Sequence, residues 1–265
     1  MKFHGGIWCL APLLAGVLVA TDLAGPGSAG PTAAGAEQPL LVDSDFNDSD
    51  TYAELRRLKE PRSWYESRND GTSGPKLLML SKKNIGGNDT HKAMIKADPK
   101  YNTYVSQEFS RPLTGPFSLQ WDIYVREILP PFNRTAFQMI GNTSVKGKGP
   151  NATGRERFVF LGFMNGETEG TINLFAFEGG EGGEWDDRTV LVRGLDLKEW
   201  YTIRVDGNAE KDRYDVSVVG VTEEPVRVKA YKTKRSPIPD SLTHISFASW
   251  NDGPGTFYVD NVLEP

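Results

Sequence analysis

Phe117-Ser-Leu-Gln-Trp-Asp-Ile-Tyr-Val125 alternates between apolar and more polar residues along its whole length. Successive side chains of a β-strand point to opposite faces, so the odd-numbered residues of this stretch share one face and the even-numbered residues share the other. The stretch His244–Trp250 shows a similar alternation. Strands with one apolar face and one polar face are typical of antiparallel sheets that pack against each other. The two stretches therefore predict a β-sandwich.

The same period of two recurs along most of the chain, in short runs separated by Gly, Pro, Asn and Asp. The expected strands are 40–46, 76–81, 91–97, 104–109, 117–125, 136–141, 157–164, 171–177, 189–192, 200–206, 214–219, 226–231, 244–250 and 256–262. Only 52–59 has a helical pattern. No change in composition and no repeat divides the chain after residue 36. Residues 37–265 are therefore predicted to form one all-β domain, a two-sheet antiparallel jelly-roll sandwich.

Residues 1–36 have the pattern of a signal peptide followed by a low-complexity leader. Lys2 precedes an apolar run at 7–20, and a segment rich in Gly, Pro, Ala and Ser follows. This run is shorter than the roughly 20 residues of a membrane-spanning helix and fits the core of a signal peptide. An Ala-x-Ala pattern ends at Ala36, and cleavage after Ala20 or Ala29 is also compatible with the sequence. We expect a secreted protein, extracellular or in the periplasm or cell envelope, with no membrane insertion after signal removal; a retained anchor is the alternative.

Charge and cysteine content narrow the possible partners. The formal net charge is −5, and acidic and basic residues are interspersed. The one basic run, at 229–235, is interpreted as a solvated strand end, so no nucleic-acid partner is expected. The single cysteine, Cys9, lies in the leader. The mature chain therefore has no disulfide, and its stability depends on core burial and on any bound ion.

Five segments carry a resemblance to a known superfamily. They are 41–46, 117–125, 199–205, 214–218 and the ending Gly255-Thr-Phe-Tyr-Val-Asp-Asn-Val262. In this order they resemble the concanavalin A-like lectin/glucanase superfamily, which includes laminin-G-like jelly rolls. The resemblance covers the mature chain and implies a carbohydrate-binding jelly roll whose partner is a polysaccharide or glycan. The superfamily also contains lyases, hydrolases and adhesion modules, so a polysaccharide lyase, a glycoside hydrolase and a non-catalytic envelope protein stay open as alternatives.

The enzymes of the superfamily imply two patterns of catalytic residues. Laminarinase-type hydrolases use paired carboxylates in Glu-x-Asp-x-x-Glu, but the nearest match, 184–189, has Thr189 in place of the second glutamate. A lyase is therefore favoured over a hydrolase. Lyases need a group that neutralises a uronate carboxylate, a base and an acid. If their strands are neighbours, the candidate residues are Gln120, Tyr124, Arg204 and His244.

Sugar binding requires a flat aromatic ring beside polar groups that hydrogen-bond to hydroxyls. Trp250 ends an expected strand, and Asn251 and Asp252 follow it in a turn. Trp185, in an expected loop, is predicted to extend the same surface. Packing at the edge of the core is the alternative role for Trp250.

Acidic and amide residues near both ends of the mature chain are candidate ligands of a structural calcium ion. They are Asp43, Asp45, Asn47 and Asp260. These positions resemble the terminal calcium sites of carbohydrate-binding jelly rolls, in which the first and last strands are adjacent. Calcium takes six to eight oxygen ligands from carboxylates and carbonyls. Capping of turns by these side chains is the alternative.

Overall fold

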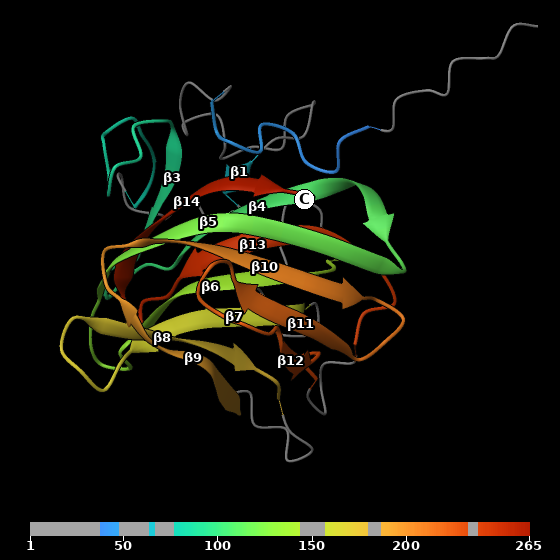
Figure 1. The fold of residues 1–265 in the computed structure, drawn as a ribbon. Helices are drawn as coiled ribbons and strands as arrows, with labels where there is room; N and C mark the ends of the chain where they lie inside the picture. Colours follow the sequence, from blue (N-terminus) through green and yellow to red (C-terminus); the bar gives the residue numbers. More distant parts are fainter. Residues whose placement is uncertain (1–37, 48–63, 67–76, 144–156, 180–186, 233–237) are drawn as a thin grey trace, which may run out of the picture. The chain divides into compact units, whose positions relative to one another are not determined.

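The structure is a computed structural model that describes residues 38–47, 64–66, 77–143, 157–179, 187–232 and 238–265 (Figure 1). The expected leader, the helical pattern at 52–59 and Trp185 lie outside these ranges. Gln38–Pro265 forms one compact unit. Within the described ranges, no helix is long and apolar enough to cross a membrane.

The described residues form fourteen strands. Their bounds are β1 (Tyr65–Glu66), β2 (Leu78–Ser81), β3 (Lys92–Lys96), β4 (Thr103–Leu113), β5 (Pro116–Ile128), β6 (Arg134–Gly141), β7 (Arg157–Asn165), β8 (Thr171–Phe177), β9 (Arg188–Asp196), β10 (Trp200–Asn208), β11 (Arg213–Val218), β12 (Val226–Lys229), β13 (Leu242–Ser249) and β14 (Gly255–Leu263). Every strand expected after residue 75 corresponds to one of these. This agreement confirms that alternation with a period of two identified the strands.

The strands form two antiparallel sheets of seven strands each. Sheet A has the order β1-β4-β13-β6-β7-β8-β9, and sheet B has the order β12-β11-β10-β5-β14-β3-β2. In sheet B, β5 lies between β10 and β14, although these three strands are far apart in the sequence (Figure 1). Two antiparallel sheets with such crossovers make a jelly-roll sandwich, so the predicted fold class is confirmed.

The core lies between the two sheets and contains the apolar face of β5. Leu119, Trp121 and Ile123 are fully buried there, as their alternation predicts. The ring of Trp121 meets that of Phe247 on β13 edge-on, with 5.8 Å between centroids. Its Nε1 donates a 2.8 Å hydrogen bond to Oε1 of Gln138 on β6. This buried glutamine satisfies an indole N–H that would otherwise lose its partner on folding.

The segment 40–46, expected to be a strand, is irregular, and that prediction is wrong. Asp43 and Phe46 have φ angles of 49° and 57°, in the left-handed region that interrupts a strand. The segment is instead fixed by single contacts, such as the 2.8 Å bond from the Val262 N–H of β14 to the Ser44 carbonyl. The two-residue strand β1 was not predicted.

Candidate functional site

Sheet A carries a second apolar layer on the face that points away from sheet B, called here the outer face. In β7, Leu161 and Phe163 belong to the core, and the alternating residue Phe160 belongs to the second layer. The outer cluster consists of Tyr104, Phe137, Met139, Phe160, Phe175, Phe177, Tyr231, Ala248 and Trp250. Antiparallel sheets commonly present one apolar and one polar face. The aromatic layer on the second face is therefore a second apolar core, with no member more than 8% exposed, and the charged and polar groups at its border make this face the candidate site.

The rings of the outer cluster stack on one another. Trp250, directly after β13, stacks on Phe137 with 4.0 Å between centroids and meets Phe160 edge-on at 5.8 Å. Phe160 also packs against Phe177, at 4.2 Å. Tyr231, which follows β12 of the other sheet, meets Phe160 edge-on at 5.3 Å. Strands from both sheets thus contribute rings to one layer.

Arg157, the first residue of β7, places its guanidinium against these rings. The Cζ atom lies 4.3 Å from the ring centroid of Phe160, 5.5 Å from that of Trp250 and 6.0 Å from that of Tyr231. Burial raises the pKa of Tyr231, although the charge of Arg157 and the hydrogen bond it donates to the Tyr231 hydroxyl act in the opposite direction. Only 6% of Arg157 is exposed. A cation with so little hydration interacts strongly with rings and with anions.

Two further arginines lie over rings of the same face. Arg134, on β6, is 1% exposed, and its Cζ lies 5.6 Å from the ring centroid of Phe177. It forms a 3.9 Å ion pair with Asp252, in the turn after β13. Arg188, on β9, lies 5.9 Å from the ring of Phe175. The outer face therefore combines an aromatic layer with three guanidinium groups.

One row of register partners crosses the outer face from β4 to β7. Glu108 pairs with His244, His244 with Gly141, and Gly141 with Arg157. Because neighbouring strands are about 4.8 Å apart, the Cα atoms of His244 and Arg157 are separated by about 10 Å. Gly141 has no side chain, so none stands between the histidine and the arginine in this row. The Nδ1 of His244 lies 2.7 Å from Oγ1 of Thr243.

A turn with polar side chains borders the aromatic layer. The Gly253 N–H donates a 3.2 Å hydrogen bond to the Trp250 carbonyl and closes the turn. The Asn251 N–H donates to Oδ1 of Asn102 at 2.6 Å, and Nδ2 of Asn102 donates to the Tyr104 hydroxyl at 3.3 Å. Amide and aromatic groups thus meet at one end of the outer face.

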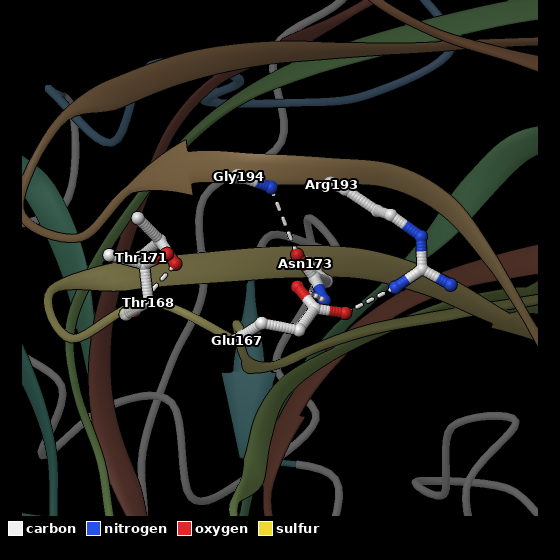
Figure 2. Close-up of polar contacts among 6 residues, drawn as sticks. All are labelled: Glu167, Thr168, Thr171, Asn173, Arg193 and Gly194. Carbon is white, nitrogen blue, oxygen red and sulfur yellow. Dashed lines mark hydrogen bonds and ion pairs between the residues drawn. The ribbon is translucent and has the colours of Figure 1, made fainter.

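A polar network lies at the edge of sheet A, between β8 and β9 (Figure 2). Oδ1 of Asn173 accepts a 2.9 Å hydrogen bond from the Gly194 N–H, and Nδ2 donates to Glu167 at 3.3 Å. Glu167 also pairs with Arg193. The φ of 68° at Gly194 favours glycine and accompanies an irregularity in the β8–β9 register. The network therefore fixes the edge strand beside the outer face.

The sequence matches no protein-family model and no curated protein. Solved structures nevertheless share its fold. A sialidase matches with a TM-score of 0.50 and 13% identity over 85% of this chain and 18% of that chain. A structure from work on endo-acting O-glycanases of the human gut microbiota matches with a TM-score of 0.50 and 10% identity, over 86% and 100% of the two chains. The catalytic domain of a glycoside hydrolase family 131 protein from Coprinopsis cinerea gives 0.49 and 15%, over 85% and 94%.

The fold is a concanavalin A-like jelly roll. The resemblance noted in the sequence is thus confirmed for the architecture. This chain spans less than a fifth of the sialidase. At these identities the likeness concerns the fold alone.

The jelly roll does not bring the four candidate lyase residues together. Gln120 and Arg204 are register partners on β5 and β10, and Tyr124 packs there against Trp200 at 5.4 Å, all in sheet B. These side chains point away from the core, and His244 lies on the outer face of sheet A. The two faces are on opposite sides of the sandwich, so the four residues line no common groove. Trp200 is half-buried on the sheet B face.

The structure does bring three of the four candidate sugar-binding residues together. Trp250, Asn251 and Asp252 lie in the turn at the end of the outer face. Trp250 is only 8% exposed, as its alternative role in edge packing implies. The fourth candidate, Trp185, lies outside the described residues.

The four candidate calcium ligands come from two segments that approach the same turn: Oδ1 of Asn47 accepts a 3.4 Å hydrogen bond from the His91 N–H, and Asp260 contacts Asn88 and Thr90. Nδ2 of Asn47 donates a 2.7 Å hydrogen bond to Asp45, and Asp43 belongs to the irregular segment before them. Asp260, on β14, accepts 2.7 Å and 2.9 Å hydrogen bonds from Asn88 and Thr90. In the part of the chain that the structure describes, no three His, Cys, Asp or Glu side chains are grouped so that they could hold a metal ion.

Arg157, Arg134 and Tyr231 were missed as site residues. Each lies at or just beyond the end of a strand, where a polar residue is ordinarily solvated. Their positions in the sequence therefore did not indicate a binding site. One signal was available for Arg157. The run Arg157–Phe163 is apolar on both faces apart from its first residue, and a charge beside such a run is more informative than one on an alternating strand.

Proposed function

We propose that this protein is exported and binds an acidic glycan on the outer face of sheet A. The observation that carries the proposal is the buried guanidinium of Arg157 against the rings of Phe160, Trp250 and Tyr231. These rings are at most 8% exposed, and they hold the guanidinium in place. A guanidinium donates two parallel hydrogen bonds to a carboxylate. The combination suits a uronate or another sugar acid.

The charges of the outer face favour an acidic glycan over a neutral one. Arg134, Arg157 and Arg188 lie over its rings. Of the acidic groups named above, Asp252 pairs with Arg134, Glu167 pairs with Arg193, and Glu108 is the register partner of His244. Low-dielectric surroundings strengthen the attraction between such cations and a carboxylate. The amides of the turn are suited to sugar hydroxyls. A sialidase and a structure from work on O-glycanases share the fold, which accords with a glycan ligand.

The test is a glycan array of acidic and neutral polysaccharides, followed by calorimetric titration of the best ligand. Arg157→Met is expected to weaken binding about tenfold or more, because it removes the charge-assisted hydrogen bonds. Arg204→Met, on sheet B, is the matched control and is expected to leave the Kd unchanged. Binding restricted to neutral glycans, or weakened by the control alone, contradicts the proposal.

Export is tested separately, by fractionation of the native host and N-terminal sequencing of the mature protein. A new N-terminus after Ala20, Ala29 or Ala36 is expected. A full-length chain in the cytoplasm would remove export from the proposal and leave glycan binding to be judged by the array.

The row from Glu108 to Arg157 favours a second function, that of a polysaccharide lyase. Arg157 would neutralise the uronate carboxylate, and His244 would take the proton from the neighbouring C5. Tyr231, kept protonated by its raised pKa, would donate a proton to the departing O4. The C4–O4 bond breaks and a C4–C5 double bond forms.

The ultraviolet absorbance of the unsaturated product distinguishes a lyase from a binder. A lyase releases product, and His244→Gln abolishes release while retaining binding. Glycan binding without release leaves recognition as the function and ends the lyase proposal.

A further inference from the structure

A buried ammonium group lies at the turn between β2 and β3. Lys92, the first residue of β3, is fully buried. Its Nζ donates a 2.9 Å hydrogen bond to the Lys83 carbonyl and a second hydrogen bond to the Thr90 carbonyl. These carbonyls lie near the two ends of the turn, so one side chain closes it.

Two carboxylates act on this ammonium through their charge, that of Asp260 on the last strand and that of Asp89 in the same turn. Asp260, on β14, is 1% exposed. Its Oδ2 accepts hydrogen bonds of 2.7 Å from Asn88 and 2.9 Å from Thr90, both in the same turn, and its Oδ1 accepts one of 2.8 Å from the Asn261 N–H. Burial lowers the pKa of Lys92, while the charges of Asp260 and Asp89 act to raise it. Burial and the charge of Asp122 raise the pKa of Asp260, although its hydrogen bonds act in the opposite direction. Lys92 and Asp260 thus connect the turn to β14 from two sides.

The residues at this junction do not fit calcium. Calcium needs six to eight oxygen ligands. The carbonyls of Lys83 and Thr90 already accept hydrogen bonds from the ammonium, and both carboxylate oxygens of Asp260 accept hydrogen bonds from N–H or O–H donors. A divalent ion beside the same carbonyls would also be repelled by the charge of Lys92.

We propose that the Lys92 ammonium is the resident cation of this junction and that the jelly roll fixes its last strand there without calcium. A metal ion in such a position would balance the charge of Asp260 and bind the carbonyls of the turn. Lys92 hydrogen-bonds to the two carbonyls directly and interacts with Asp260 only through its charge. Because this cation is part of the chain, it does not dissociate, and the stability of the junction does not depend on metal concentration. The proposal is independent of the ligand of the outer face.

Thermal unfolding of the purified protein, with EDTA or with millimolar calcium, tests the proposal. The wild-type Tm is expected to be the same in both conditions. Lys92→Met keeps the side-chain stem but leaves Asp260 without its cation, and it is expected to lower the Tm by about 10 °C. Lys96→Met, at an exposed position of the same strand, is the matched control and is expected to leave the Tm unchanged.

The double variant Lys92→Met/Asp260→Asn removes both charges and is expected to recover part of the Tm that Lys92→Met loses. It also provides the readout if Lys92→Met fails to fold. Two results overturn the proposal: a Tm of Lys92→Met equal to that of the control, or a calcium-induced rise in the wild-type Tm that Asp260→Asn abolishes. A calcium response that persists in Asp260→Asn comes from another site. In that case the Tm of Lys92→Met relative to that of Lys96→Met decides whether the proposal stands.

Discussion

Replacement of Trp250 by alanine separates structural packing from ligand contact at the outer face. The indole is stacked on Phe137 at 4.0 Å, meets Phe160 at 5.8 Å and is 8% exposed. Truncation of a buried tryptophan costs about 3–5 kcal/mol. Loss of the contact with Arg157 at 5.5 Å adds about 0.5–1 kcal/mol. We therefore expect Trp250→Ala to lower the free energy of unfolding by about 4 kcal/mol.

The assay is urea unfolding followed by far-ultraviolet circular dichroism, with a parallel thermal melt. For a domain of this size, about 4 kcal/mol corresponds to a fall in Tm of about 8–16 °C. Trp250→Phe keeps a ring on Phe137 and is expected to recover more than half of the loss. A loss below about 1 kcal/mol, the range of surface substitutions, would refute the packing argument and make Trp250 an open platform for a sugar ring.

Two further substitutions test buried and exposed polar pairs. Gln138→Leu leaves Nε1 of Trp121 without its acceptor and is expected to cost about 1–3 kcal/mol in urea unfolding; an unchanged midpoint would show that this bond is not needed. Burial raises the pKa of Asp206, but the hydrogen bonds and the charge of Arg204 bring it below its usual value. The stabilisation from Asp206 is therefore present above the unfolded-state pKa of about 3.9 and is lost as the pH falls through the folded-state pKa. The stabilities of wild type and Asp206→Asn should converge on acidification, and divergence would contradict the direction of this shift.

The strands were predictable because their signal is local. β8 has the bounds expected from its alternation, and β5 contains the whole expected stretch 117–125. The segment 40–46 also looked like a strand, but the left-handed φ angles of Asp43 and Phe46 interrupt it. The contacts that fix this segment come from distant parts of the chain, such as Val262, and no local pattern contains that information.

The candidate site was less predictable because it depends on which sheet each strand joins. Gln120 and Arg204 were expected to lie together if their strands were neighbours, and the structure makes them register partners. His244 shows the same kind of alternation, yet its strand belongs to the other sheet. The surroundings of Arg157 come from β7, from the end of β13 and from the segment after β12, three parts of the chain whose proximity follows only from the folded topology.

If the protein binds acidic polysaccharides, as proposed above, the buried ammonium of Lys92 has a further consequence. Such polymers carry dense carboxylates and bind divalent cations themselves, so they compete for any calcium that a protein holds by equilibrium binding. A domain fixed by a dissociable ion would lose stability where its ligand is most concentrated. A cation bonded covalently to the backbone is not subject to that competition, so the proposed junction would keep this jelly roll folded inside an ion-exchanging gel.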